Sequence, residues 1–417
     1  MANLFQKRVL ILALFAGEIM MKSGAEISRV ESTIIRICRA CHIDRVECFA
    51  TTTGIFLSIH SGNDDDDMQT FIKRIDRTDI DLKKISAINV FARVFTSTDL
   101  TVVDGLEQLK KIEAIKPYPF LVRVLAAMVC GAFFVPYYFG GTSDIFCAAL
   151  VSGAAYGLSY VISLLEFPPF IRIFVSCFVA TALILLLQVF YLEDNSPAVI
   201  VSAVSIFMPG VAITNAARDM LAGDLLSGVA RLVEALIAAI AIAGGIGMCM
   251  AGWKIINAQP LPAAAIPYPL WSYFFFGALI TAGFAVLFNA PVRRIPVIAV
   301  IGGIGMISYQ FLYFHGYSIL ASCFLGTFLV AILSEVASRA GKDATTIFIL
   351  PGIIPFVPGA AIYRTMAKLL ESDFEAVAQN GSETLMMVGG ISIAIALVAA
   401  LTRLGSSIIR RISRKGI

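Results

Sequence analysis

The stretch PGVAITNAARDMLAGDLLSGVARLVE, residues 209–234, places charged side chains between two apolar segments of the chain. Its ionisable residues are Arg218, Asp219, Asp224, Arg231 and Glu234. A charge at membrane depth is costly unless it is paired or faces water, so this pattern indicates a functional site. Pro209 removes a helix hydrogen bond and Gly210 leaves the backbone free to turn, so we expect a helix to break where the charges begin.

The composition of the whole chain is typical of a protein that crosses a membrane several times. Of the 417 residues, 58% are hydrophobic and 15% are charged, and the mean hydropathy is +0.85. These values lie outside the usual range of soluble domains. The net charge of +3 is small, and the basic residues fall mostly in short loops and at the C-terminus. This distribution favours membrane topology over nucleic-acid binding.

The chain divides near residue 116 into a mixed N-terminal part and an apolar remainder. For residues 1–116 we predict a small cytoplasmic α+β domain. Its predicted strands are 46–53, 55–60 and 68–75; its predicted helices are one long helix through residue 37, then 81–95 and 100–115. We expect Asp99 to cap the last of these helices.

The remainder predicts a polytopic α-helical membrane protein with about ten transmembrane helices, because a span needs about 20 apolar residues. The predicted spans are 119–138, 145–165, 170–191, 197–214, 226–250, 268–288, 296–314, 317–335, 344–362 and 384–404. Basic residues in alternate loops and in the tail predict that both termini are cytoplasmic, at the cell (inner) membrane.

Four short motifs recur in the same order 146 to 150 residues later in the chain. The recurring motifs are Pro117-Tyr118-Pro119 at Pro267, Ser159-Tyr160 at Ser308, Ser176-Cys177-Phe178 at Ser322, and Met208-Pro209-Gly210 at Val357. Because five spans are an odd number, the second copy enters the membrane from the opposite side. We therefore predict two inverted five-helix repeats, residues 117–255 and 256–417, the second ending in a basic cytoplasmic tail.

Inverted repeats with broken helices are typical of secondary transporters, in which the substrate lies between the repeats near the midplane. We predict helix-break or gating roles for Pro209, Gly210, Pro358 and Gly359. We predict substrate-binding roles for Thr214, Asn215, Arg218, Arg231 and Tyr363, and proton-coupling roles for Asp219, Asp224 and Glu234. Since the second copy has Ala367, Lys368 and Asn380 at the matching positions, we expect the first copy to supply most of the charge of the site.

Several alternative interpretations stay open. The charges could form local ion pairs, Arg218 with Asp219 and Arg231 with Glu234, that only fix helix ends. CRACH, residues 38–42, fits the pattern of covalent haem attachment, but an incidental pair of thiols is the favoured interpretation. The run Asp64–Asp67 is better explained as a solvated loop than as a cation site. Glycine clusters at 244–247 and 302–305 indicate close helix packing. We predict no catalytic residue, metal or cofactor, although a membrane enzyme or signalling protein remains an alternative.

Four segments resemble the threonine/serine exporter family. They are MMKSGAEISRVEST at 20–33, FATTTGI at 49–55, PGVAITNAARDMLAGDLLSGVARLVEA at 209–235 and PFVPGAAIYR at 355–364. The resemblance implies a cytoplasmic domain before about ten spans, and export of small hydrophilic amino acids driven by the proton gradient or membrane potential. It leaves export of succinate or related dicarboxylates as an alternative. The expected partners are the small-molecule substrate, protons and the lipid bilayer, and self-association into a homo-oligomer stays open.

Overall fold

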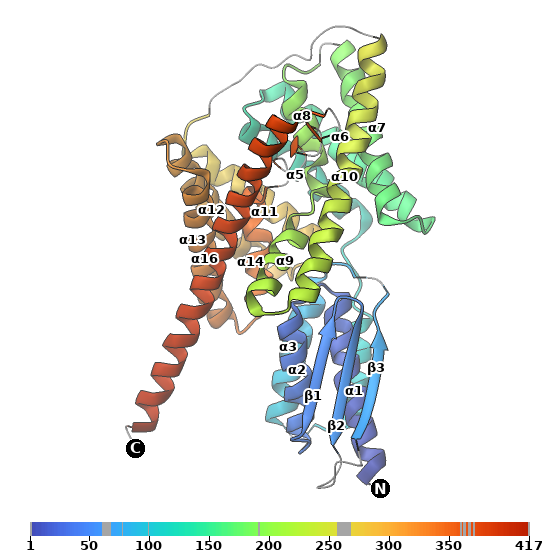
Figure 1. Ribbon diagram of the computed structural model, residues 1–417, viewed down its shortest axis with the longest axis vertical. Helices are drawn as coiled ribbons and strands as arrows, with labels where there is room; N and C mark the ends of the chain where they lie inside the picture. Colours follow the sequence, from blue (N-terminus) through green and yellow to red (C-terminus); the bar gives the residue numbers. More distant parts are fainter. Residues whose placement is uncertain are drawn as a thin grey trace.

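A computed structural model describes residues 2–60, 68–76, 78–98, 100–190, 192–256, 268–358, 361, 364–365, 368–369 and 372–415. The chain is mostly helical, and its N-terminal elements form a separate layer at one end of the molecule, where both termini lie (Figure 1). These elements are α1 Ala2–Lys22, α2 Ile27–Ala40, β1 Val46–Thr51, β2 Gly54–His60, β3 Met68–Arg74, α3 Leu82–Ser97 and α4 Val102–Glu113. The three strands pair antiparallel in the order β1-β2-β3. β1 and β3 lie within the predicted ranges, and β2 begins one residue earlier than predicted, at Gly54.

Two local predictions for the N-terminal part are wrong. The expected long helix is two helices, because Gly24 adopts a positive φ of 78° and turns the chain between α1 and α2. The apolar pattern continues through both helices because both pack on one core, which includes Ile19 and Ile34. The cap of α4 is Thr101, whose side chain accepts a hydrogen bond from the Asp104 N–H, and not Asp99.

Within the described residues, seven helical segments are long and apolar enough to cross a membrane. They are α5 Phe120–Phe134 with η1 Val135–Tyr138, α6 Thr142–Leu164, α7 Pro169–Val189, α10 Leu225–Ile256, η3 Val292–Arg294 with α12 Ile295–Phe314, α13 Ile319–Gly341 and α16 Phe374–Lys415. An eighth is bent by 57° between Ser196–Phe207 and Gly210–Met220. It consists of α8 Ser196–Val204, η2 Ser205–Phe207 and α9 Gly210–Ala222. The break falls at Met208-Pro209, where the sequence predicts it.

The two remaining predicted spans are shorter apolar helices. They are α11 Ser272–Leu287 and the segment formed by α14 Thr346–Ile353 with η4 Ile354–Phe356. Prolines limit the length of the second segment, since Pro351 lies inside α14 and Pro355 lies in η4. The protein is therefore a polytopic helical membrane protein with seven or eight candidate spans in the described part, fewer than the ten predicted.

Matching glycines pack helices together at matching places in the two predicted repeats. A Cβ atom at Gly245 of α10 would lie 2.5 Å from the Phe174 carbonyl oxygen of α7. A Cβ atom at Gly390 of α16 would lie 2.7 Å from the Leu320 carbonyl oxygen of α13. The same added Cβ atoms would lie 3.1 Å from Cys177 Cβ and 3.2 Å from Cys323 Cβ, in the recurring Ser-Cys-Phe motif. The same crossing thus occurs twice, and the glycine cluster at 244–247 serves helix packing as predicted.

The N-terminal elements dock against the loops of the second predicted repeat. The backbone N–H groups of Leu82 and Lys83, at the start of α3, donate to the carbonyl groups of Phe288 and Asn289 at 2.9 Å. Ser86 of α3 donates to Asp343 at 2.5 Å. The Asp81 N–H, next to α3, donates to the Ser23 carbonyl oxygen at 3.2 Å, so this docking also places the turn between α1 and α2 near the membrane helices.

Candidate functional site

A cavity of about 480 Å³ lies between segments of the two predicted repeats. Its lining includes Tyr137, Tyr138, Phe139, Asn195, Pro197, Ala198, Ile200, Val201 and Met250 from the first, and Tyr309, Gln310, Tyr313, Ile319, Val357, Pro358, Ala361, Arg364, Glu383 and Met387 from the second. Two contributing segments, α8 and the first turns of α16, lie in the half of the molecule away from the N-terminal elements (Figure 1). The cavity therefore lies toward the membrane face opposite the N-terminal elements.

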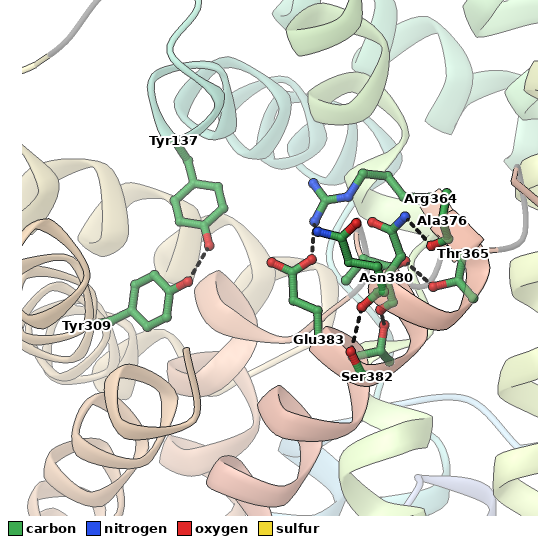
Figure 2. Close-up of polar contacts among 11 residues, drawn as sticks. Tyr137, Tyr309, Arg364, Thr365, Ala376, Asn380, Ser382 and Glu383 are labelled. Atoms are coloured by element: carbon green, nitrogen blue, oxygen red, sulfur yellow. Dashed lines mark hydrogen bonds and ion pairs between the residues drawn. The ribbon is translucent and has the colours of Figure 1, made fainter. Parts of the chain in front are cut away.

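Among the described lining residues, the charged groups are one ion pair. Arg364 Nη2 lies 3.2 Å from Glu383 Oε2 (Figure 2). The two side chains are 46% and 31% exposed, so both offer accessible atoms to a ligand. Since an exposed ion pair is worth only about 0–1 kcal/mol, a ligand with complementary charges can compete for both partners.

Neutral polar side chains also line the cavity. Tyr137 donates a hydrogen bond from its hydroxyl to the Tyr309 hydroxyl at 3.1 Å (Figure 2). Gln310 is 2% exposed, and its Oε1 has no hydrogen-bond partner within the described residues. A buried acceptor without a partner costs about 1–3 kcal/mol, which a bound ligand with an N–H or O–H group would recover.

Two of the residues predicted to bind substrate, Arg218 and Arg231, lie in a different place, at the turn between α1 and α2. Arg218 of α9 forms an ion pair with Glu26. Arg231 of α10 lies 3.0 Å from Asp219 and donates to the Ala25 carbonyl oxygen at 3.2 Å. The alternative local pairs, Arg218 with Asp219 and Arg231 with Glu234, are not the ion pairs that form. The charges instead link two membrane helices to the N-terminal elements.

The other predicted residues are distributed as follows. Thr214 donates its hydroxyl to the Gly210 carbonyl oxygen at 2.9 Å, and Asn215 is buried with an Oδ1 that has no partner within the described residues. Asp224 is half-buried and Glu234 is exposed. Pro358 lines the cavity, whereas Tyr363 and Gly359 lie outside the described residues. The cavity takes its ion pair from the second copy. That the first copy supplies most of the charge of the substrate site stays a prediction.

The sequence interpretation missed Glu26. Its carboxylate accepts from Arg218 and from the Thr346 hydroxyl, the latter at 2.8 Å. Burial raises the pKa of this carboxyl, but the charges of Arg218 and Arg29 and the Thr346 hydrogen bond outweigh burial, so its pKa is lowered. The MKSGAE segment was a usable signal, since Gly24 permits the turn that presents Glu26.

The CRACH segment does not have the geometry of an accessible attachment site. Cys38 is fully buried in the hydrophobic core, and burial raises the pKa of its thiol to about 12. A protonated core thiol is a poor nucleophile. Across the described ranges, no group of three or more His, Cys, Asp or Glu side chains could hold a metal ion.

Comparison with known proteins places the chain among exporters. A family model described as "Putative threonine/serine exporter" matches residues 11–253, and one described as "Threonine/Serine exporter, ThrE" matches residues 273–401. The threonine/serine exporter of Corynebacterium glutamicum is 25% identical over 97% of this chain and 83% of its own length. The "Probable threonine/serine exporter" of Mycobacterium tuberculosis is 21% identical over 89% of this chain and 72% of its own.

A shorter relative carries a different name. The "Probable succinate transporter subunit YjjP" of Escherichia coli is 25% identical over 60% of this chain and 96% of its own length. No solved structure matches the chain. Because the first family model alone covers more than half of the residues, the chain belongs to the threonine/serine exporter family.

Proposed function

We propose that the protein is a secondary active transporter that exports threonine, serine or similar small hydrophilic amino acids across the cell (inner) membrane. The observation that carries this proposal is the Arg364–Glu383 ion pair, which opens onto a cavity of about 480 Å³ between the two predicted repeats. The volume falls within the usual range for small-molecule sites, roughly 300–1,000 Å³.

An amino acid is complementary to this ion pair. Its carboxylate can accept from the Arg364 guanidinium, and its ammonium group can donate to the Glu383 carboxylate; each such charge-assisted bond is worth about 1.5–3 kcal/mol. A side-chain hydroxyl, as in threonine and serine, can donate to Gln310 Oε1. The ligand thus satisfies both charges and the unpaired acceptor.

A dicarboxylate fits the same groups less well. Succinate would place one carboxylate on Arg364 and would bring the other close to Glu383, where like charges repel. No second cation is present among the described lining residues. The cavity therefore favours a zwitterion over the dicarboxylate alternative.

Export also requires that access alternate between the two faces of the membrane. We assign the N-terminal elements and both termini to the cytoplasm. The structure is then an outward-facing state, closed where α9 and α10 contact the turn between α1 and α2. In the inward-facing state the inverted repeats rock apart there, and Thr214, Asn215, Arg218, Arg231 and Tyr363 then contact the entering amino acid. Asp219, Asp224 and Glu234 are available to exchange protons at that face, where the proton motive force drives the cycle.

Counterflow in vesicles reconstituted with the full chain tests the proposal. Labelled threonine and serine should exchange, and R364Q and E383Q should each weaken the apparent affinity by about tenfold or more. R339Q is the matched control, because Arg339 pairs with Glu335 four residues earlier on α13 and lies outside the cavity. Exchange of succinate alone would establish the alternative, and absence of any exchange would refute a transporter for these substrates.

A further inference from the structure

A buried carboxyl group lies beside the cavity in the turn between α7 and α8. Glu193 is 5% exposed; its Oε1 accepts from the Ser196 hydroxyl, and its Oε2 has no hydrogen-bond partner within the described residues. Asn195 and Pro197, on the same segment, line the cavity. Glu193 thus has one oxygen without a partner, in the chain segment that forms a cavity wall.

The groups around Glu193 are acidic. Asp144 of α6 is fully buried and accepts three backbone hydrogen bonds, from the N–H groups of Gly141 at 2.7 Å, Asp194 at 2.8 Å and Asn195 at 3.1 Å. Both carboxylate oxygens of Asp144 therefore have backbone donors. The exposed Asp194 and the Cys147 thiol, which donates to the Leu192 carbonyl oxygen at 3.2 Å, complete the titratable surroundings.

The matching position in the second repeat has the opposite arrangement of charge. Arg294 directly precedes α12 and Asp343 precedes α14, whereas Asp144 lies in the first turn of α6 and Glu193 precedes α8, so the four residues take comparable places in the two copies. Arg294 Nε lies 2.7 Å from Asp343 Oδ2, so a cation neutralises the carboxylate there. In the first repeat Asp144 replaces that cation. Two carboxyl groups in one buried site avoid repulsion when one of them holds a proton.

We propose that Glu193 is a proton-binding site of the exporter, loaded from the outer solution while the cavity faces outward. An O–H bond forms at Oε2 with a proton from outer water, and the carboxylate loses its charge. Both oxygens of Asp144 already accept backbone N–H groups, so Glu193 Oε2 is the carboxylate oxygen that is left for the proton. This inference rests on the proposed function, since it names the group through which a proton gradient would act.

The surroundings of Glu193 suit this task. Burial, followed by the charges of Asp144 and Asp194, raises its pKa to about 7, against the opposing effect of the Ser196 hydrogen bond. A carboxyl with such a pKa gains and loses its proton across the physiological range. The segment that titrates is also the segment that lines the cavity, so protonation and amino-acid release can be coupled.

Vesicles reconstituted with the full chain separate proton coupling from substrate binding. In E193Q, threonine transport driven by a pH gradient should fall about tenfold or more, while counterflow at equal pH stays within about twofold of wild type. E166Q, in the exposed turn between α6 and α7, is the matched control and should change neither rate. The pH midpoint of gradient-driven transport should rise in S196A, which removes a bond that lowers the pKa, and fall in D194N, which removes a nearby negative charge.

The outcomes distinguish the two proposals. Gradient-driven transport that survives in E193Q at its wild-type rate and pH dependence would overturn the role of Glu193 and leave the exporter intact. Absence of threonine and serine counterflow in the wild-type protein would overturn the proposed function, and this inference with it. If E193Q does not fold, S196A and D194N provide the test. A pH midpoint of gradient-driven transport that is unchanged in both variants would refute the proton site.

Discussion

Gly210 lies so close to Val357 that a Cβ atom at residue 210 would be 2.6 Å from Val357 Cγ1. The two residues belong to the recurring motif at the helix breaks. The residue before each proline is extended in the same way, with φ −63° and ψ 130° at Met208 and φ −68° and ψ 136° at Val357. Since Val357 also lines the cavity, the two breaks meet beside the cavity.

Adding a methyl group at this contact should disturb the closed state. We expect G210A to slow threonine counterflow about tenfold and to destabilise the protein by about 1–3 kcal/mol, because the methyl group overpacks the junction. V357A should restore much of both losses in the double variant, since it removes the atoms that clash. Counterflow rates and thermal unfolding in detergent measure these effects.

Gly252 provides the control for this substitution, because a Cβ atom there would have nothing within 4 Å. G252A should leave counterflow unchanged. Normal transport by G210A, or a double variant no better than G210A, would show that the contact between the breaks is not part of the gate.

Removal of the Glu26 carboxylate should destabilise the contact between α9 and the turn that joins α1 to α2. E26Q leaves Arg218 in place with 17% of its side chain exposed and without its ionic partner. Leaving one charge of a buried pair uncompensated costs about 3–5 kcal/mol. Denaturant or thermal unfolding should show this loss, whereas E47Q, an exposed carboxyl on β1, should unfold like the wild type.

The same carboxyl predicts a pH dependence of stability. The pKa of Glu26 is lowered below the ordinary value of 4.5. Its contribution to the free energy of unfolding is therefore complete above pH 4.5 and is lost as the pH falls through the pKa of the folded state. The difference in stability between wild type and E26Q should therefore be constant near neutral pH and should shrink in acid below about pH 4.5. A difference that grows on acidification would show that Glu26 is not held as an anion.

Sequence patterns predicted the features that depend on neighbouring residues, such as strands and helix breaks. They missed the contacts between residues that are far apart in the chain. The break at Pro209 follows from the proline itself, and the strands follow from β-branched runs. The partner of Arg218 could not be predicted, because Glu26 lies 192 residues away and reaches it only through a turn at Gly24. The pattern of apolar residues continued across that turn and concealed it.

The cavity was harder to predict than the charge cluster. Its ion pair joins a residue just after the second break to one on α16, and neither Arg364 nor Glu383 stands out in a run of charges. The spacing of 149 residues between Met208 and Val357 also separates Glu234 from Glu383, which was a usable signal. It could not show that Glu234 is exposed whereas Glu383 lines a cavity, because burial depends on which helices pack against each copy.

Neighbouring glycines on α16 provide a test of the repeated helix crossing. G390A should lower the free energy of unfolding by about 1–3 kcal/mol, because its Cβ would meet the Leu320 carbonyl oxygen, and backbone cannot move aside cheaply. G389A should be neutral or stabilising by up to about 1 kcal/mol, because a Cβ there meets nothing within 4 Å and alanine favours a helix over glycine.

The corresponding position in the first repeat should respond in the same way. G245A places a Cβ against the Phe174 carbonyl oxygen, and we expect a loss similar to that of G390A in thermal unfolding of the full chain. If α7 with α10 and α13 with α16 are equivalent units, the two losses should agree within about 1 kcal/mol and should add in the double variant, because the two crossings share no residue. A loss at one glycine only would mean that the two crossings differ in how tightly they pack, and that the likeness of the repeats does not extend to their energetics.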